Sequence, residues 1–137
     1  MPHDPVRLED TRAWLHKAGS DLRAAKVGLE AAPPLLEDVA FHCQQAVEKA
    51  LKAFLTWHDR PFRRTHDLVE LGGQCAEIEA ALEPLLRRAA ALSEYAWAYR
   101  YPGEPTPVTP ESAERSFALA REVLDGVLAR LPAEIRS

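Results

Sequence analysis

The stretch LEDVAFHCQQAVEKALKAFLTWH, residues 36–58, decides the fold of this chain. Its apolar residues recur at intervals of three and four, which is the period of an amphipathic helix. Small residues such as Cys43, Ala46 and Ala50 gather on the apolar side. A neighbouring helix can approach closely there. We therefore expect a helix over residues 36–58 that packs against another helix.

The opposite side of this expected helix is polar, with one aromatic residue in its centre. Its members are Gln45, Glu48, Lys49, Lys52 and Thr56, together with Phe41. Glu48 and Lys52 are four residues apart, the spacing of ion pairs on helix surfaces. We interpret this side as a solvated face, on which Phe41 marks a partner surface. The alternative is a ligand-binding face to which Lys49 and Lys52 contribute.

Four more segments have the helical period. Over residues 8–31, leucines recur every seven residues with alanines between them, and two prolines then end the helix. A short helix follows Thr65, which we expect to be its N-cap, with Asp67 in the first turn. The next helix spans residues 82–99, and the last begins with Thr109 as N-cap and Pro110 in the first turn.

No segment alternates with period two, so no strand is expected. The sequence predicts one all-α domain over residues 1–137. Its architecture is an up-down antiparallel helical bundle of four long helices plus one short helix.

Composition narrows the class of protein. A chain of 137 residues with 47% hydrophobic and 28% charged residues fits one globular domain. No apolar run approaches the roughly 20 residues that a membrane span needs. The first residues, MPHDPVRLED, lack a basic region followed by an apolar stretch, so we expect no secretory signal and a cytoplasmic location.

Cysteine and histidine spacing indicates no metal site. Cys43 and Cys75 form no paired metal-binding motif, and we interpret both as reduced core residues. The one combination worth considering, His58 and Asp59 with His66, has no supporting pattern. We therefore expect no metal and no cofactor.

The stretch RPFRRTHDL, residues 60–68, concentrates positive charge in a chain whose net charge is −4. Arg60, Arg63, Arg64 and His66 form a local basic rim, which suits a focused anionic ligand better than a long polyanion. Arginine can hold phosphate with two hydrogen bonds, and histidine can transfer a proton near neutral pH. The alternative is a helix-start turn with solvated arginines.

A second stretch, EYAWAYRYPGEP over residues 94–105, combines aromatics with a cation. Its rings stand two residues apart, so they point to different sides of a helix. Arg100 and Tyr101 could there hold a phosphate and stack on a base. The alternative is a helix end whose rings cover the bundle, with Arg100 bound to terminal carbonyls.

Two motifs resemble a known family. The segment FHCQQAVEKALKAFLTWHDRPFRRTHDLVEL, residues 41–71, and the later YRYPGE, residues 99–104, resemble the HEPN domains of prokaryotes, in the branch with THDL and RYP motifs. The likeness covers nearly the whole chain. It implies a helical bundle that is often a homodimer. It also implies a gene neighbour, often a minimal nucleotidyltransferase, in arrangements that look like toxin–antitoxin pairs.

The resemblance carries a catalytic motif only in part. Some HEPN proteins are metal-independent ribonucleases with an arginine and a histidine separated by four to six residues. In those members the arginine lies near the end of the penultimate long helix, where this chain has Arg100, and no histidine follows it. Arg60 and His66 have the spacing, but in an earlier loop.

Three functional hypotheses follow. The preferred one is a dimeric HEPN module that binds an anionic ligand (a nucleotide or RNA), partners a minimal nucleotidyltransferase in a toxin–antitoxin-like pair, or does both. Arg60, Arg63, Arg64 and His66 would form one rim, and Arg100 with Tyr101 another. The second is a metal-independent endoribonuclease toxin with His66 as general base and Arg60 or Arg100 as the cation. The third is a structural subunit that docks a nucleotidyltransferase through Phe41.

Overall fold

The computed structural model describes residues 4–96 and 107–136, and in these residues every regular element is helical. The predicted all-α class is confirmed. The α-helices are α1 (Pro5–Glu30), α2 (Leu36–Trp57), α3 (Leu68–Ile78), α4 (Glu83–Ala89), α5 (Pro110–Leu128) and α6 (Ala133–Arg136). Two 3₁₀ segments, η1 (Ala80–Leu82) and η2 (Ala90–Ala96), flank α4.

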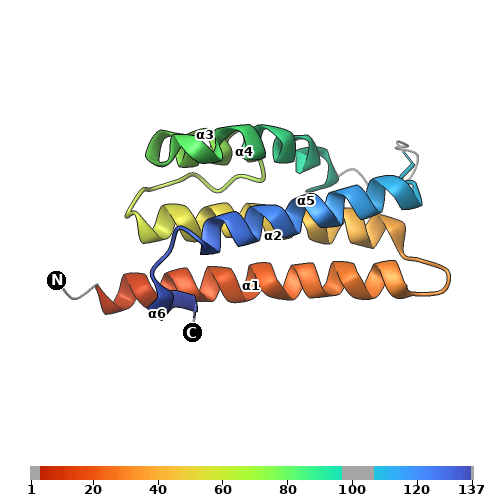
Figure 1. Cartoon of the computed structure of the whole chain (residues 1–137), viewed down its shortest axis with the longest axis horizontal. Coiled ribbons are helices and arrows are strands. Elements are labelled where there is room, and N and C mark those ends of the chain that lie inside the picture. Colours follow the sequence, from red (N-terminus) through yellow and green to blue (C-terminus); the bar gives the residue numbers. More distant parts are fainter. Residues whose placement is uncertain (1–3, 97–106, 137) are drawn as a thin grey trace.

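Helix α2 is the centre of the fold. Figure 1 shows α1 below α2 and α5, and the pair α3 and α4 above them. Helix α2 contacts α1, α5, α3 and η2, so it takes part in every layer of the bundle. The expected span of 36–58 is therefore confirmed to within one residue, and so is its role as a packing partner.

Small residues let α1 and α2 approach each other. Ala18 and Ala25 of α1 are fully buried, whereas the leucines that recur every seven residues are half-buried beside them. A Cβ added at Gly28 would lie 2.8 Å from a methyl group of Val39, which is itself fully buried. The two helices thus pack through alanine and glycine, with leucines sealing the edges.

The prediction of one helix over residues 82–99 is wrong beyond Ala89. The helix expected over 82–99 begins with α4, which ends at Ala89 and passes into the 3₁₀ segment η2. There the Ser93 hydroxyl accepts the backbone N–H of Leu68 at 2.9 Å, so a contact with α3 competes with the local helical period. The part of that prediction over residues 97–99 lies outside the described residues.

The N-cap of α3 is Asp67 rather than Thr65. The Asp67 carboxylate accepts the backbone N–H of Val69 at 2.9 Å, and Thr65 instead accepts the N–H of Asp67 at 3.0 Å. The Asp67 carboxylate, two residues after Thr65, thus caps the helix in place of the Thr65 hydroxyl. Its negative charge also complements the helix dipole. The start of α5 agrees with the sequence, because Thr109 is its N-cap, Pro110 is its first residue, and Thr109 forms a capping box with Ser112.

The connection between α2 and α3, residues 58–67, runs back along α2 instead of leaving the bundle. The Arg60 N–H binds the Leu55 carbonyl at 2.8 Å, and the Gln44 side chain binds the His66 carbonyl at 3.3 Å. In Figure 1 this yellow-green segment passes along α2 before it reaches α3. It covers much of the polar side of that helix.

The solvated face expected on α2 is therefore a wrong interpretation. Gln44 is fully buried, and Glu48, Lys52 and Gln45 are 3%, 7% and 9% exposed. Helical period identifies the polar side, but it does not reveal that another segment covers that side with groups able to bond it.

Three expectations drawn from composition concern the cysteines, a metal site and membrane-spanning helices. Cys43 and Cys75 are free and buried, as predicted, and burial raises the pKa of each thiol to about 12. The described residues hold no group of histidine, cysteine and acidic side chains arranged for a metal. Within the same residues, none of the helices combines the length and the apolarity that crossing a membrane requires.

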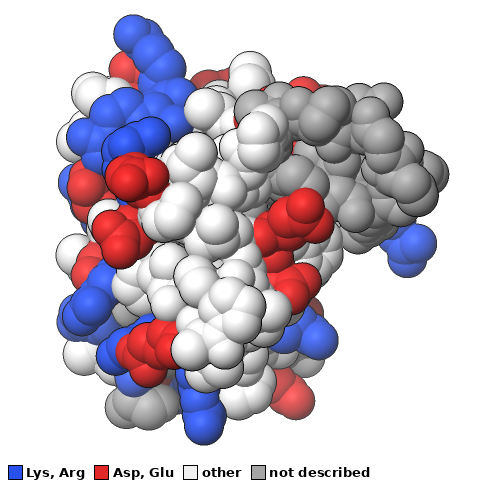
Figure 2. Space-filling view, turned by 90° about the vertical axis from the view of Figure 1, so that its right-hand side faces the viewer, with Lys and Arg blue, Asp and Glu red and all other residues white. Residues whose placement is uncertain are grey.

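One end of the bundle is poor in charge. Figure 2 views the end where α1 turns into α2 and shows a broad central area without lysine, arginine or acidic residues. Val27 and Leu35, on either side of this turn, are 62% and 50% exposed. The basic connection 58–67 instead follows the polar side of α2, away from this charge-poor end of the bundle.

Candidate functional site

A single buried carboxylate organises the polar side of α2. Glu48 accepts a hydrogen bond from Lys52 Nζ at 2.9 Å and another from Gln44 Nε2 at 3.0 Å. Its Oε1 atom also lies 2.7 Å from Nδ1 of His66, in the connection that covers α2. The Glu48 side chain is only 4% exposed, so these three groups replace its hydration shell.

The contacts keep Glu48 ionised. Burial on its own would raise the pKa of this carboxyl group, but hydrogen bonds from Lys52, His66 and Gln44 and the charge of Lys52 outweigh it. The net effect is a pKa below the ordinary value of 4.5. Because an ionised carboxylate only accepts hydrogen bonds, Nδ1 of His66 must carry the proton between them. The buried acid thus selects the tautomer of a ring whose side chain is 46% exposed.

Lys52 is a counter-ion inside the fold. Its side chain is 9% exposed, and its ammonium lies 5.5 Å from the ring centroid of Trp14 and 5.8 Å from that of Phe62. The two rings meet edge to face at 6.2 Å. Aromatic faces attract a cation, so the rings from α1 and from the 58–67 connection hold Lys52 beside Glu48. The i, i+4 pair expected from the sequence exists, but it is buried.

A second carboxylate binds the neighbouring part of the same helix face. Asp21 of α1 lies 2.8 Å from His42 Nδ1 and accepts a hydrogen bond from Lys49 Nζ at 2.5 Å. Asp21 is 9% exposed, so this pair also closes the contact between α1 and α2. Lys49, a predicted ligand-binding residue, is thus partnered by an acid of the chain itself.

The three arginines of the basic rim differ in their partners. Arg60 binds Glu77 near the end of α3, and Arg63 binds Glu70 at 2.9 Å, an ion pair that raises the pKa of Arg63. Arg64 is exposed and has no ion pair within the part of the chain that the structure describes. Arg64 is therefore the arginine of this connection whose charge is not already balanced.

The structure does not bring Arg60 and His66 to a shared group, because they bond to different carboxylates, Glu77 and Glu48. The second predicted rim, Arg100 with Tyr101, lies outside the described residues. Phe41, the predicted interface residue, is half-buried, and its ring stands edge-on to His42 with centroids 5.4 Å apart.

Sequence reasoning missed Gln44 and Trp14 as members of this site. Gln44 had a signal, since it stands four residues before Glu48 and a glutamine amide at that spacing can bond a carboxylate. It also accepts a 2.6 Å hydrogen bond from Gln45. Trp14 had no comparable signal, because only the packing of α1 on α2 brings it near Lys52.

This arrangement has a definite chemical capacity. An imidazole whose Nδ1–H is held by a buried carboxylate presents Nε2 in a fixed orientation, where it can bind an anion when protonated or accept a proton when neutral. Half of the His66 side chain is accessible for either role. Arg64, two residues before His66, adds a cation to the same connection.

We predict that the Glu48–Lys52 pair is energetically coupled. Lys52→Met or Glu48→Leu alone leaves a buried charge without its partner and should lower the free energy of unfolding by about 3–5 kcal/mol. The double variant should lose much less than the sum of the two. Urea unfolding followed by circular dichroism measures all three.

The matched control is another i, i+4 pair, Glu83 with Arg87, whose side chains are 41% and 78% exposed. Glu83→Gln should change the unfolding free energy by less than about 1 kcal/mol. Additive losses in the double variant, or single-variant losses as small as the control's, would contradict the coupling.

Comparisons with known proteins bear on what this site does. The family model described as the HEPN domain matches residues 11–130, which contain all of α2, α3, α4 and α5. The match thus includes the Glu48 cluster and the connection that covers it. Comparison with curated proteins gave no match, and neither did comparison with solved structures.

Proposed function

Because this chain belongs to the HEPN domain family, we propose that it binds an anionic ligand, a nucleotide or RNA, through His66 and Arg64. The observation that carries the proposal is the 2.7 Å contact between His66 and the buried, ionised Glu48. This contact ties the accessible imidazole of His66, which lies in the 58–67 connection, to a residue of the rigid helix α2.

The charges of the connection favour the same two residues. Arg60, Arg63, Lys49 and Lys52 remain predicted ligand-binding residues, but each is bound to a carboxylate of this chain. A phosphate would have to compete with those acids. Arg64 has no such competitor among the described residues, so it offers a phosphate a full charge at the lowest cost.

The Glu48–His66 contact also favours a second function, a metal-independent endoribonuclease. A carboxylate that holds the Nδ1–H of an imidazole leaves Nε2 able to take the proton of a ribose 2′-hydroxyl. The developing negative charge would then need a cation. Arg64 is near in sequence, Arg60 would first have to leave Glu77, and Arg100 lies outside the described residues.

Titration with labelled ATP, GTP and a short RNA in EDTA tests the binding proposal. His66→Gln and Arg64→Gln should each weaken binding about tenfold or more, since a hydrogen bond to a charged group contributes about 1.5–3 kcal/mol. The matched control is Arg63→Gln, whose guanidinium already bonds Glu70. It should weaken binding less than about threefold.

The same RNA samples separate the two functions. Intact RNA with saturable binding indicates a binding module, whereas cleavage that His66→Gln abolishes indicates the endoribonuclease. Absence of binding at millimolar ligand would contradict the binding proposal. So would an effect of Arg63→Gln as large as that of Arg64→Gln.

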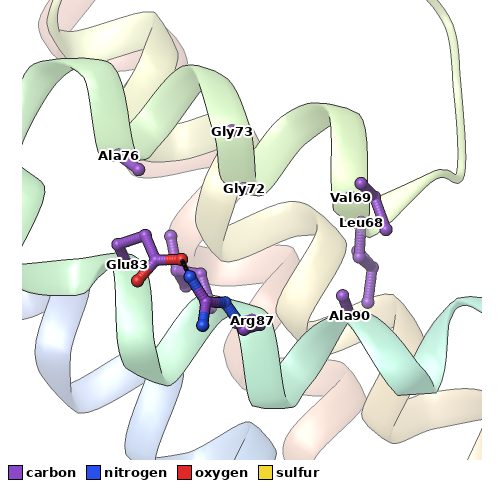
Figure 3. A pocket seen from close by; sticks show the side chains of 9 residues that line it. Leu68, Val69, Gly72, Gly73, Ala76, Glu83, Arg87 and Ala90 are labelled. Atoms are coloured by element: carbon purple, nitrogen blue, oxygen red, sulfur yellow. Dashed lines mark hydrogen bonds and ion pairs between the residues drawn. The ribbon is translucent and has the colours of Figure 1, made fainter.

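We also propose that the module is a homodimer. A groove of about 250 Å³ lies between α3 and α4, and Figure 3 shows Gly72 and Gly73 on one side of it and Arg87 on the other. Val69 at its edge is 66% exposed. A Cβ at Gly73 would meet nothing within 4 Å, so packing within the chain does not require this helix-weakening glycine. A projecting valine beside a hollow is self-complementary under twofold symmetry.

Light scattering after size exclusion tests the homodimer. Wild type should have twice the chain mass of 15.3 kDa, and Val69→Glu should reduce the mass to that of one chain. Val27→Glu, at an equally exposed valine on α1, should leave the dimer intact. A wild-type mass of one chain, or a dimer that survives Val69→Glu, would contradict it.

A minimal nucleotidyltransferase is the further partner that the family resemblance suggests, docked on the α2 face that carries Phe41. Half-burial of this ring leaves part of it at the surface. Co-expression followed by co-purification tests the docking, and a complex unaffected by Phe41→Ser would remove Phe41 from the interface.

A further inference from the structure

The side of α1 that points away from α2 carries exposed basic residues. Ala18, Asp21 and Ala25 are buried on the side that packs against α2. The opposite side presents four exposed residues at intervals of four, seven and three, which keep side chains on one face of a helix: Arg12, His16, Arg23 and Lys26. We call these four residues the α1 basic face. In Figure 1 the helix that carries it forms the lower edge of the bundle.

Acidic residues leave this face largely unneutralised. Residues 11–29 contain a single acid, Asp21, which is buried and bonded to α2. Two exposed acids, Glu9 and Glu30, lie beyond the two ends of the face, and neither has an ion pair with a described residue. Glu30 stands four residues after Lys26, yet the two do not pair. The middle of α1 is therefore positive in a chain whose net charge is −4.

The two ends of the face differ in what they already bind. The guanidinium of Arg12 donates a hydrogen bond to the backbone carbonyl of Glu134 in α6. Arg23 and Lys26 have no ion pair with any residue in the described ranges. They are three residues apart, a spacing at which like charges repel and weaken a helix. The stability of α1 thus gives no reason for these two cations, whereas a negatively charged partner would.

Small residues separate the two halves of the face. Gly19 and Ser20 lie between His16 and Arg23, which are about 10 Å apart along the helix axis at 1.5 Å per residue. A Cβ added at Gly19 would meet nothing within 4 Å, so packing within the chain does not require this helix-weakening glycine. The face therefore consists of two groups of basic residues with a low, smooth stretch between them.

We propose that the α1 basic face binds double-helical RNA across its minor groove. The two groups of basic residues contact phosphates of the two strands that border the groove. The minor groove of an RNA duplex is wide and shallow and displays 2′-hydroxyls, so the low stretch at Gly19 can approach it and the exposed Ser20 hydroxyl can bond a 2′-hydroxyl. The minor groove of B-DNA is only about 6 Å wide, and its deep major groove suits a protruding helix, which α1 is not.

Two other anionic partners fit this face less well. Surfaces that bind single strands combine cations with aromatic rings on which bases stack. The one aromatic ring of α1, that of Trp14, instead lies 5.5 Å from the Lys52 ammonium, toward α2. Helices that bind membrane surfaces insert large apolar side chains, but between Arg12 and Lys26 the only exposed apolar residue is Ala13.

This proposal rests on the proposed function in one respect, because it names double-helical RNA as a class of ligand for the same chain. It uses a different surface. His66 bonds Glu48 on the polar side of α2, whereas the α1 basic face lies on the side of α1 away from α2. The two sites can therefore be tested separately.

Fluorescence anisotropy of the full chain with a fluorescein-labelled RNA duplex of about 16 base pairs tests the face. Wild type should bind with an affinity that falls steeply as salt rises. The double variant Arg23→Gln with Lys26→Gln should weaken binding about tenfold or more. It should also reduce the slope of log affinity against log salt by about two, because each lost phosphate contact removes about one. Gly19→Leu should weaken binding about fivefold and make the helix more stable, since it fills the low stretch.

The matched control is Arg115→Gln with Arg121→Gln, the same charge change at two exposed residues of α5. It should leave affinity within about twofold and the salt slope unchanged. Absence of duplex binding by wild type, an equal effect of the control, or a DNA duplex of the same sequence bound as tightly would overturn the proposal.

Nucleotide titration of the same samples separates this inference from the proposed function. Nucleotide binding that depends on His66, without any duplex binding, would overturn the α1 basic face and leave the proposed function standing. Duplex binding that the α1 double variant weakens, without any nucleotide binding, would support the α1 basic face and contradict a nucleotide site at His66.

Discussion

The buried ion pair between Glu48 and Lys52 is the interaction on which the rest of this structure depends. Two charges inside a helical bundle are tolerated only if each is bonded, and three segments supply a bond or a ring to this pair. Helix α1 contributes Trp14, the 58–67 connection contributes Phe62 and His66, and α2 itself contributes Gln44. Satisfying this pair draws the connection back along α2 and so determines where α3 begins.

The same constraint links the fold to the candidate function. If the connection left α2 at Trp57, His66 would be an ordinary histidine in a solvated loop. Because the connection lies along α2, His66 bonds a carboxylate that the interior keeps ionised, and the exposed part of its ring has a fixed orientation. Glu77 and Glu70 neutralise two arginines of the connection, Arg60 and Arg63, whereas Arg64 has no ion pair among the described residues.

Much of the fold could be predicted from the sequence because it is local. The period of residues 36–58, the alanines of α1 and the Thr109–Pro110 start of α5 each carry their own signal. Predictions failed where a distant segment intervened. Ser93 bonds α3 and belongs to a 3₁₀ segment. The N-cap of α3 is a local exception, because Asp67, only two residues after Thr65, caps the helix in its place. The polar side of α2 looked solvated because no local pattern announces that residues 58–67 will cover it. The sequence identified the basic residues as candidates. It did not show which of the arginines have an ion pair, because their partners Glu70 and Glu77 come near only in the folded chain.

The tautomer of His66 tests the central claim most directly, namely that a buried, ionised Glu48 holds this imidazole by Nδ1. Long-range ¹H–¹⁵N correlation spectra of protein labelled with ¹⁵N-histidine distinguish the two ring nitrogens. At a pH where the ring is neutral, His66 should carry its proton on Nδ1, and His16, which has no bond to a carboxylate among the described residues, serves as the internal reference. A neutral His66 that carries its proton mainly on Nε2 would contradict the account.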